Sequence, residues 1–176
     1  MECGSRIQMM LHIPPEWLWP YIASNLTAIA LLLIAWKRPV VAKWLFAAMF
    51  LGACYANTTL VLREPSQYLN YDQFLLLGIY HTFITGFFSE HIQLIVLAIA
   101  FGQLVIGLLL CGKGTVARLG CLGAAVFLTA IIPLGVGSAF PFSLICIWAL
   151  YLIEGSLRRA NDQPKARTGS NQAVVH

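Results

Sequence analysis

The sequence predicts an all-α membrane protein, a bundle of about five transmembrane helices with a short interfacial or re-entrant segment. Residues 92–111 hold no charge and no proline, and a bilayer core of ~30 Å requires about 20 such residues of helix. The chain of 176 residues is 59% hydrophobic and 10% charged, whereas soluble domains carry about 25% charged residues. Runs this rich in Leu, Ile and Ala predict helices rather than the alternating strands of a barrel.

The first part of the chain predicts a short tail and two spans. Residues 1–16 form the N-terminal tail, and the helical membrane domain covers the chain from there to residue 157. The first span, 17–36, opens with aromatic residues typical of a membrane interface. It ends at a basic pair before Pro39, which makes the turn into the second span, 40–62.

The segment 74–88 leaves two topologies open. It is only 15 residues long and rich in aromatic residues, and such lengths favour an interfacial or re-entrant segment over a span. If it crossed the membrane instead, the chain would have six spans and its N-terminus would lie inside. The third span, 92–111, follows it in either topology.

The last two spans are expected at 119–136 and 140–157. Gly120 and Gly123 give the first of them a face of small residues, which suits close helix packing. Glu154 and Arg158 are spaced to pair at i,i+4 at the end of the last span. The polar residues 158–176 predict a disordered cytoplasmic tail.

The distribution of Lys and Arg favours the five-span topology, because basic residues prefer the inner side of a membrane. Five spans with the N-terminus outside leave only Arg6 and Arg63 outside. The other nine basic residues then face inward: Lys37, Arg38, Lys43, Lys113, Arg118, Arg158, Arg159, Lys165 and Arg167. Six spans with the N-terminus inside would place eight basic residues inside and three outside.

Polar side chains in this topology collect toward the outer leaflet and suggest a candidate ligand pocket. Its residues are Asn57, Thr58, His81, Glu90, His91 and Gln103. Such a pocket would bind a quinone as cofactor, or a lipid headgroup. The alternative is that these groups hydrogen-bond between helices or sit at a wet interface. No catalytic or metal-binding motif such as HExxH is present, so we expect no metal site.

From Lys43 onward the chain resembles the DoxX-like superfamily of small four-helix membrane proteins. The resemblance rests on a span opened by a basic residue, a long joint over 63–91, and a span that ends in Gly107-Leu-Leu-Leu-Cys-Gly-Lys113. A basic turn with Arg118, a final hairpin and a basic tail complete it. It implies a membrane accessory protein linked to redox chemistry, similar to a subunit of a terminal quinol oxidase. The first span would then be an N-terminal addition.

These observations together predict a multi-pass protein of the cell membrane that acts as a non-catalytic accessory or scaffold subunit, with a redox link. The alternative is a small membrane enzyme or a quinone- or lipid-binding protein that uses the outer-leaflet pocket. We expect the lipid bilayer and either another membrane protein or a second copy as partners. The net charge of +4 is spread over span ends and tail, which argues against nucleic-acid binding.

Overall fold

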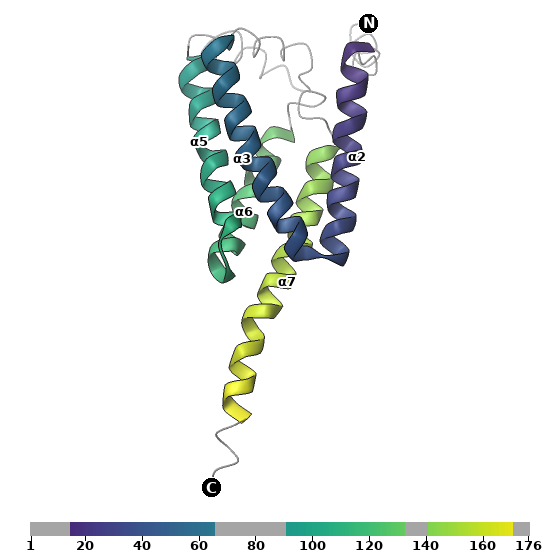
Figure 1. Ribbon diagram of the computed structural model, residues 1–176, viewed down its shortest axis with the longest axis vertical. Helices are drawn as coiled ribbons and strands as arrows, with labels where there is room; N and C mark the ends of the chain where they lie inside the picture. The colour runs from purple at the N-terminus through teal and green to yellow at the C-terminus, as the bar shows by residue number, and fades with distance from the viewer. Residues whose placement is uncertain (1–14, 66–90, 133–140, 171–176) are drawn as a thin grey trace, which may run out of the picture.

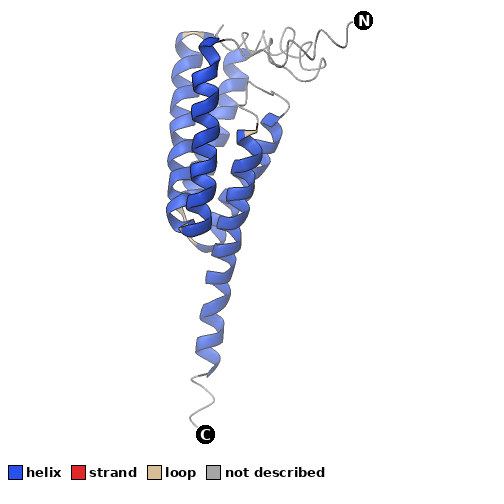
Figure 2. Ribbon diagram, turned by 90° about the vertical axis from the view of Figure 1, so that its right-hand side faces the viewer, coloured by secondary structure: helices blue, strands red, loops and turns tan. Residues whose placement is uncertain are grey.

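The computed structural model describes residues 15–65, 91–132 and 141–170. These residues form five helices and no strand, which confirms the all-α fold class (Figure 1, Figure 2). The helices are α2 (Pro15–Lys37), α3 (Pro39–Arg63), α5 (Ile92–Cys111), α6 (Gly114–Ile131) and α7 (Phe142–Ser170).

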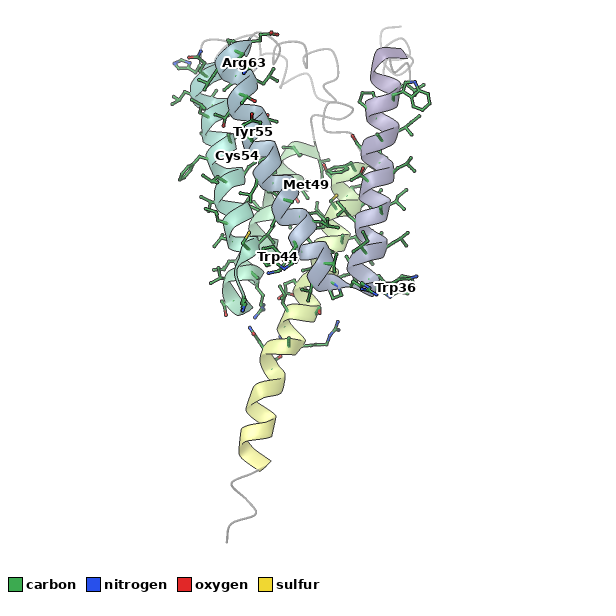
Figure 3. All side chains as sticks on the ribbon, viewed as in Figure 1. Trp36, Trp44, Met49, Cys54, Tyr55 and Arg63 are labelled. Atoms are coloured by element: carbon green, nitrogen blue, oxygen red, sulfur yellow. The ribbon has the colours of Figure 1, made fainter. Side chains whose placement is uncertain are left out.

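The helices run up and down between two ends of the bundle. At one end α2 turns into α3 and α5 turns into α6, and we call this the basic end because Lys37, Arg38 and Lys113 lie there (Figure 1). The opposite end, which we call the far end, holds the end of α3 and the start of α5. Figure 3 shows Trp36 at the basic end and Arg63 at the far end.

Four of these helices, α2, α3, α5 and α6, are long and apolar enough to cross a membrane. This finding supports the prediction of a multi-pass membrane protein. Helix α7 packs against α6 and α2 through its apolar first half, but it is not among the four helices that meet this criterion in the described part of the chain. The fifth span therefore stays a prediction.

The ends of α3 and α5 meet at the far end, where Val61 packs against Ile92 and Val96. The chain therefore leaves α3 and enters α5 at the same end of the bundle, as the five-span topology requires. The interfacial or re-entrant segment at 74–88 and the tail 1–16, apart from its last two residues, lie outside the described residues.

Helix α5 packs at short range between α3 and α6. A Cβ atom on Gly107 of α5 would lie 2.8 Å from Leu51 of α3, and a Cβ on Gly120 of α6 would lie 2.7 Å from the backbone nitrogen of Leu110. Because Gly120 meets backbone rather than a flexible side chain, α6 can approach α5 this closely only without a side chain there. The predicted small-residue face is thus confirmed as a packing surface.

Two predicted boundaries need correction. Helix α6 begins at Gly114 rather than at residue 119, because Gly114 makes the turn with φ +55° and the residues after it, Arg118 included, continue as helix. Helix α7 runs on to Ser170. The prediction of a disordered tail from residue 158 onward is therefore wrong for residues 158–170. This stretch mixes good helix formers (Ala, Arg, Gln and Lys) with Asn, Asp, Pro, Thr and Gly, so local propensity does not account for the extension.

We predict that Gly120→Ala lowers the free energy of unfolding in detergent by roughly 1–3 kcal/mol, because the new methyl group must displace the backbone of α5. Thermal unfolding followed by fluorescence-detected gel filtration measures the change. Gly102→Ala is the matched control, since a Cβ on Gly102 meets nothing within 4 Å. Equal melting temperatures for the two variants would mean that α5 and α6 are not in close contact.

Candidate functional site

The structure brings together two of the six predicted pocket residues. The Asn57 Nδ2 group of α3 donates a hydrogen bond of 2.9 Å to Gln103 Oε1 of α5. Gln103 is only 5% exposed, so its amide is held inside the helix pair. In a bilayer core a polar amide needs such a partner, and this bond supplies it between two neighbouring helices.

The other predicted pocket residues are not gathered around this bond. Thr58 is half-buried on α3, next to Asn57 in sequence. His91 occupies the N-cap position of α5 without a side-chain capping bond, and the 12 residues from there to Gln103 correspond to ~18 Å along the helix. His81 and Glu90 lie outside the described residues. Among the described members, Asn57 and Gln103 form a contact between helices, and His91 lies well away from it.

Several hydroxyl groups within the helices bond to their own backbone, whereas the buried Ser143 hydroxyl of α7 has no hydrogen-bond partner. Thr59 Oγ1 donates to the Tyr55 carbonyl oxygen at 2.9 Å, and Thr129 Oγ1 donates to that of Ala125 at 2.8 Å. Ser24 Oγ in α2 does the same to Pro20 at 2.7 Å. Such bonds to the preceding turn satisfy a hydroxyl without a neighbouring helix, so these side chains need no ligand.

A buried lysine joins α3 to the turn between α5 and α6 at the basic end. Lys43 is 5% exposed, and its Nζ donates a hydrogen bond of 2.7 Å to the carbonyl oxygen of Gly112. Gly112 is the C-cap of α5, where carbonyl groups lack helical partners and the helix dipole favours a cation. The ammonium also lies 4.6 Å from the centre of the Trp44 ring.

An ion pair connects α6 to α7 near the same end. Arg118 Nε lies 2.8 Å from Glu154 Oε1, and the two side chains are 35% and 30% exposed. The sequence predicts that Glu154 pairs with Arg158 along one helix, whereas in the structure its bond goes to Arg118 on the neighbouring helix. We correct that prediction accordingly.

A hollow of about 490 Å³ lies between α6 and α7; we call it the α6/α7 hollow. Its floor includes Cys121 and Leu150, which are buried. Leu119, Leu122 and Tyr151 line it with outward-facing apolar side chains that are more than half exposed. Its volume falls in the range of ~300–1,000 Å³ that is usual for ligand pockets.

Polar groups line one end of the α6/α7 hollow. Thr115, Arg118 and Glu154 lie there, toward the basic end, and we call this end its mouth. None of the four described members of the predicted pocket, Asn57, Thr58, His91 and Gln103, lines the hollow. Sequence patterns do not predict the hollow, because it depends on how two helices pack. The one available signal is Arg118, an arginine next to an apolar run.

The described residues contain no group of three or more His, Cys, Asp or Glu side chains that could hold a metal ion. Comparisons with protein-family models, with curated proteins and with solved structures find no match. The resemblance to the DoxX-like superfamily is therefore untested by them and stays a prediction.

We predict that Asn57 and Gln103 are energetically coupled by about 0.6 kcal/mol, and by no more than ~1.7 kcal/mol, as is usual for hydrogen bonds between helices in a bilayer. A double-mutant cycle with Asn57→Leu and Gln103→Leu measures the coupling through the free energy of unfolding in mixed micelles. A second cycle pairs Thr59→Val with Gln103→Leu and should give no coupling, because the Thr59 hydroxyl bonds to its own helix. Equal coupling in both cycles would refute a specific bond.

Proposed function

We propose that the chain is a non-catalytic accessory or scaffold subunit of a membrane assembly, resident in the cell membrane. The observation that carries the proposal is the hydrogen bond between Asn57 and Gln103. Two residues that suggest a ligand pocket in the sequence are joined by a hydrogen bond between neighbouring helices. This bond supports a role of Asn57 and Gln103 in helix packing.

The outward surface of α2 supports a role in assembly. Only 17% of its span is buried, the lowest share among the four candidate spans. Ala28, Leu31 and Ala35 form its buried side. Its outward side is mostly apolar, with Trp19 and Trp36 near its two ends and Thr27 as an exposed polar residue between them. Because α2 is covered on one side alone, its other side offers a broad face for a neighbouring membrane protein.

The resemblance to DoxX-like proteins agrees with this proposal. That superfamily has a four-helix plan, to which α2 would be an addition outside the plan. A helix that is added at the edge of a bundle and remains largely uncovered is well suited to contact a partner. The resemblance also extends the proposal to a redox-linked assembly.

The test is purification of the tagged full chain from its native membrane in mild detergent, with quantification of every co-purified protein. We expect one membrane protein at a fixed stoichiometry. The paired substitutions Leu26→Trp and Leu33→Trp on the exposed side of α2 should reduce its recovery several-fold without lowering the abundance of the chain. Leu94→Trp with Leu108→Trp, on the exposed side of α5, provides the matched control.

A clean monomer, or equal recovery of the partner with both pairs of substitutions, would contradict the proposal. The alternative function, a small enzyme or a quinone- or lipid-binding protein that uses the outer polar residues, predicts a different result. His81→Ala or Glu90→Gln would then abolish the cellular function at unchanged membrane abundance. Loss of abundance together with function would make these residues structural.

A further inference from the structure

We propose that the α6/α7 hollow binds one anionic phospholipid, with an acyl chain along its apolar floor and the headgroup phosphate at Arg118. The proposal concerns the basic end of the bundle and is independent of the accessory role proposed above. It rests on the shape of the hollow, on its apolar lining and on the charge at its mouth.

The hollow lies at membrane depth and needs an apolar occupant. It extends along α6 from Thr115 to Ala125, which corresponds to ~15 Å of helix. Cys121 and Leu150 at its floor are 2% and 1% exposed, whereas Leu122 at its rim is 61% exposed. A bilayer offers no water to fill such a space, so lipid or another protein segment must occupy it.

The dimensions of the hollow favour an acyl chain over a helix. A volume of about 490 Å³ spread over ~15 Å of helix gives a mean cross-section of ~30 Å². An α-helix with its side chains is 10–12 Å across, or ~80–110 Å² in cross-section. A whole partner helix is therefore too wide to lie within the hollow and would enter it only with its side chains, whereas a flexible hydrocarbon chain can lie along it.

The charge at the mouth favours an anionic headgroup. Lys113 immediately precedes α6, Arg118 lies in its second turn, and Arg158 lies one turn beyond Glu154 on the same face of α7. Against these three cations stand Glu154 and, a further turn along α7, Asp162. Of these charged groups, only Arg118 and Glu154 line the hollow itself, so the positive balance around its mouth comes from the neighbouring Lys113 and Arg158. Basic pockets between helices on the inner side of a membrane are typical sites for anionic headgroups.

The ion pair leaves Arg118 able to bind a phosphate. Its bond to Glu154 uses the Nε–H group, which is one of the five N–H donors of a guanidinium. The Nη groups can donate to phosphate oxygens in the paired geometry that arginine favours. Thr115, one turn before Arg118 on α6, adds a hydroxyl at the same mouth. Glu154 thus orients the guanidinium and also competes with the phosphate for it.

The experiment is native mass spectrometry of the purified full chain, equilibrated with equal amounts of phosphatidylglycerol and phosphatidylcholine that carry the same acyl chains. We expect one phosphatidylglycerol to be retained in preference to phosphatidylcholine. Arg118→Gln should reduce this retention about fivefold, the amount expected for one basic residue at an anionic lipid surface. Arg63→Gln, the same change of charge at the far end, should leave it unchanged.

Two further variants separate lipid binding from a structural role of the ion pair. Glu154→Gln breaks the same pair but removes the competing carboxylate, so phosphatidylglycerol retention should stay equal or rise. Leu122→Trp fills the hollow and should abolish retention, whereas Leu94→Trp on the outer side of α5 should not.

The proposal is overturned if both lipids are retained equally, if Arg118→Gln and Glu154→Gln reduce retention alike, or if Leu122→Trp has no more effect than Leu94→Trp. It is also overturned if the wild-type chain retains no lipid and forms a dimer that Leu122→Trp dissociates, because a second copy would then cover the hollow.

Discussion

The close approach of α6 to α5 at Gly120 is the contact on which the rest of the bundle depends. It brings the two backbones together at a point where a Cβ would lie 2.7 Å from a backbone nitrogen. Helix α5 is also tied to α3, through Gly107 against Leu51 and through the Asn57–Gln103 bond. Helices α3, α5 and α6 thus form one tightly packed unit. Hydrophobicity alone distinguishes little between helices in a bilayer, so such close contacts decide which helices meet.

The polar interactions within the membrane-spanning part of the bundle differ from those at its basic end. Within the membrane depth, several amides and hydroxyls bond to one another or to their own helix, which satisfies them where no water is available, whereas Asn25 Oδ1 and Ser143 Oγ are buried without a hydrogen-bond partner. At the basic end the charged groups join different elements, with Lys43 on the cap of α5 and Arg118 on Glu154 of α7. The same ion pair stands at the mouth of the α6/α7 hollow, so this end combines structural pairing with the capacity to bind an anion.

The parts of the fold that could be predicted from the sequence are those set by local composition. The bounds of α5 match the prediction residue for residue. They could be predicted because the run 92–111 is apolar and uncharged, with His91 directly before it and Lys113 shortly after it. The start of α6 was missed because Arg118 resembled a loop residue, while its partner Glu154 lies 36 positions away. The bond between Asn57 and Gln103 joins residues 46 apart, and single-sequence patterns carry no signal for such a pairing.

The candidate site shows the same limit. The sequence identified Asn57 and Gln103 as polar residues in need of a partner, and the structure supplies the partner from within the same set. The α6/α7 hollow depends on how two helices pack rather than on a motif, and the arginine within α6 is the one sequence signal near it. Its apolar lining residues are indistinguishable in sequence from those that face lipid elsewhere on the bundle.

The most direct test of the bundle's placement in a membrane is cysteine accessibility in sealed, right-side-out vesicles, with single cysteines at Gln67, Ser89, Thr115 and Asn161 in a cysteine-free background. Thr115 is preferred to Gly114, whose positive φ would strain a cysteine. We expect an impermeant reagent to label Gln67 and Ser89 directly, and the other two only after the vesicles are opened. Labelling of Thr115 in sealed vesicles, or of Gln67 and Ser89 from opposite sides, would contradict the five-span bundle with its basic end inside.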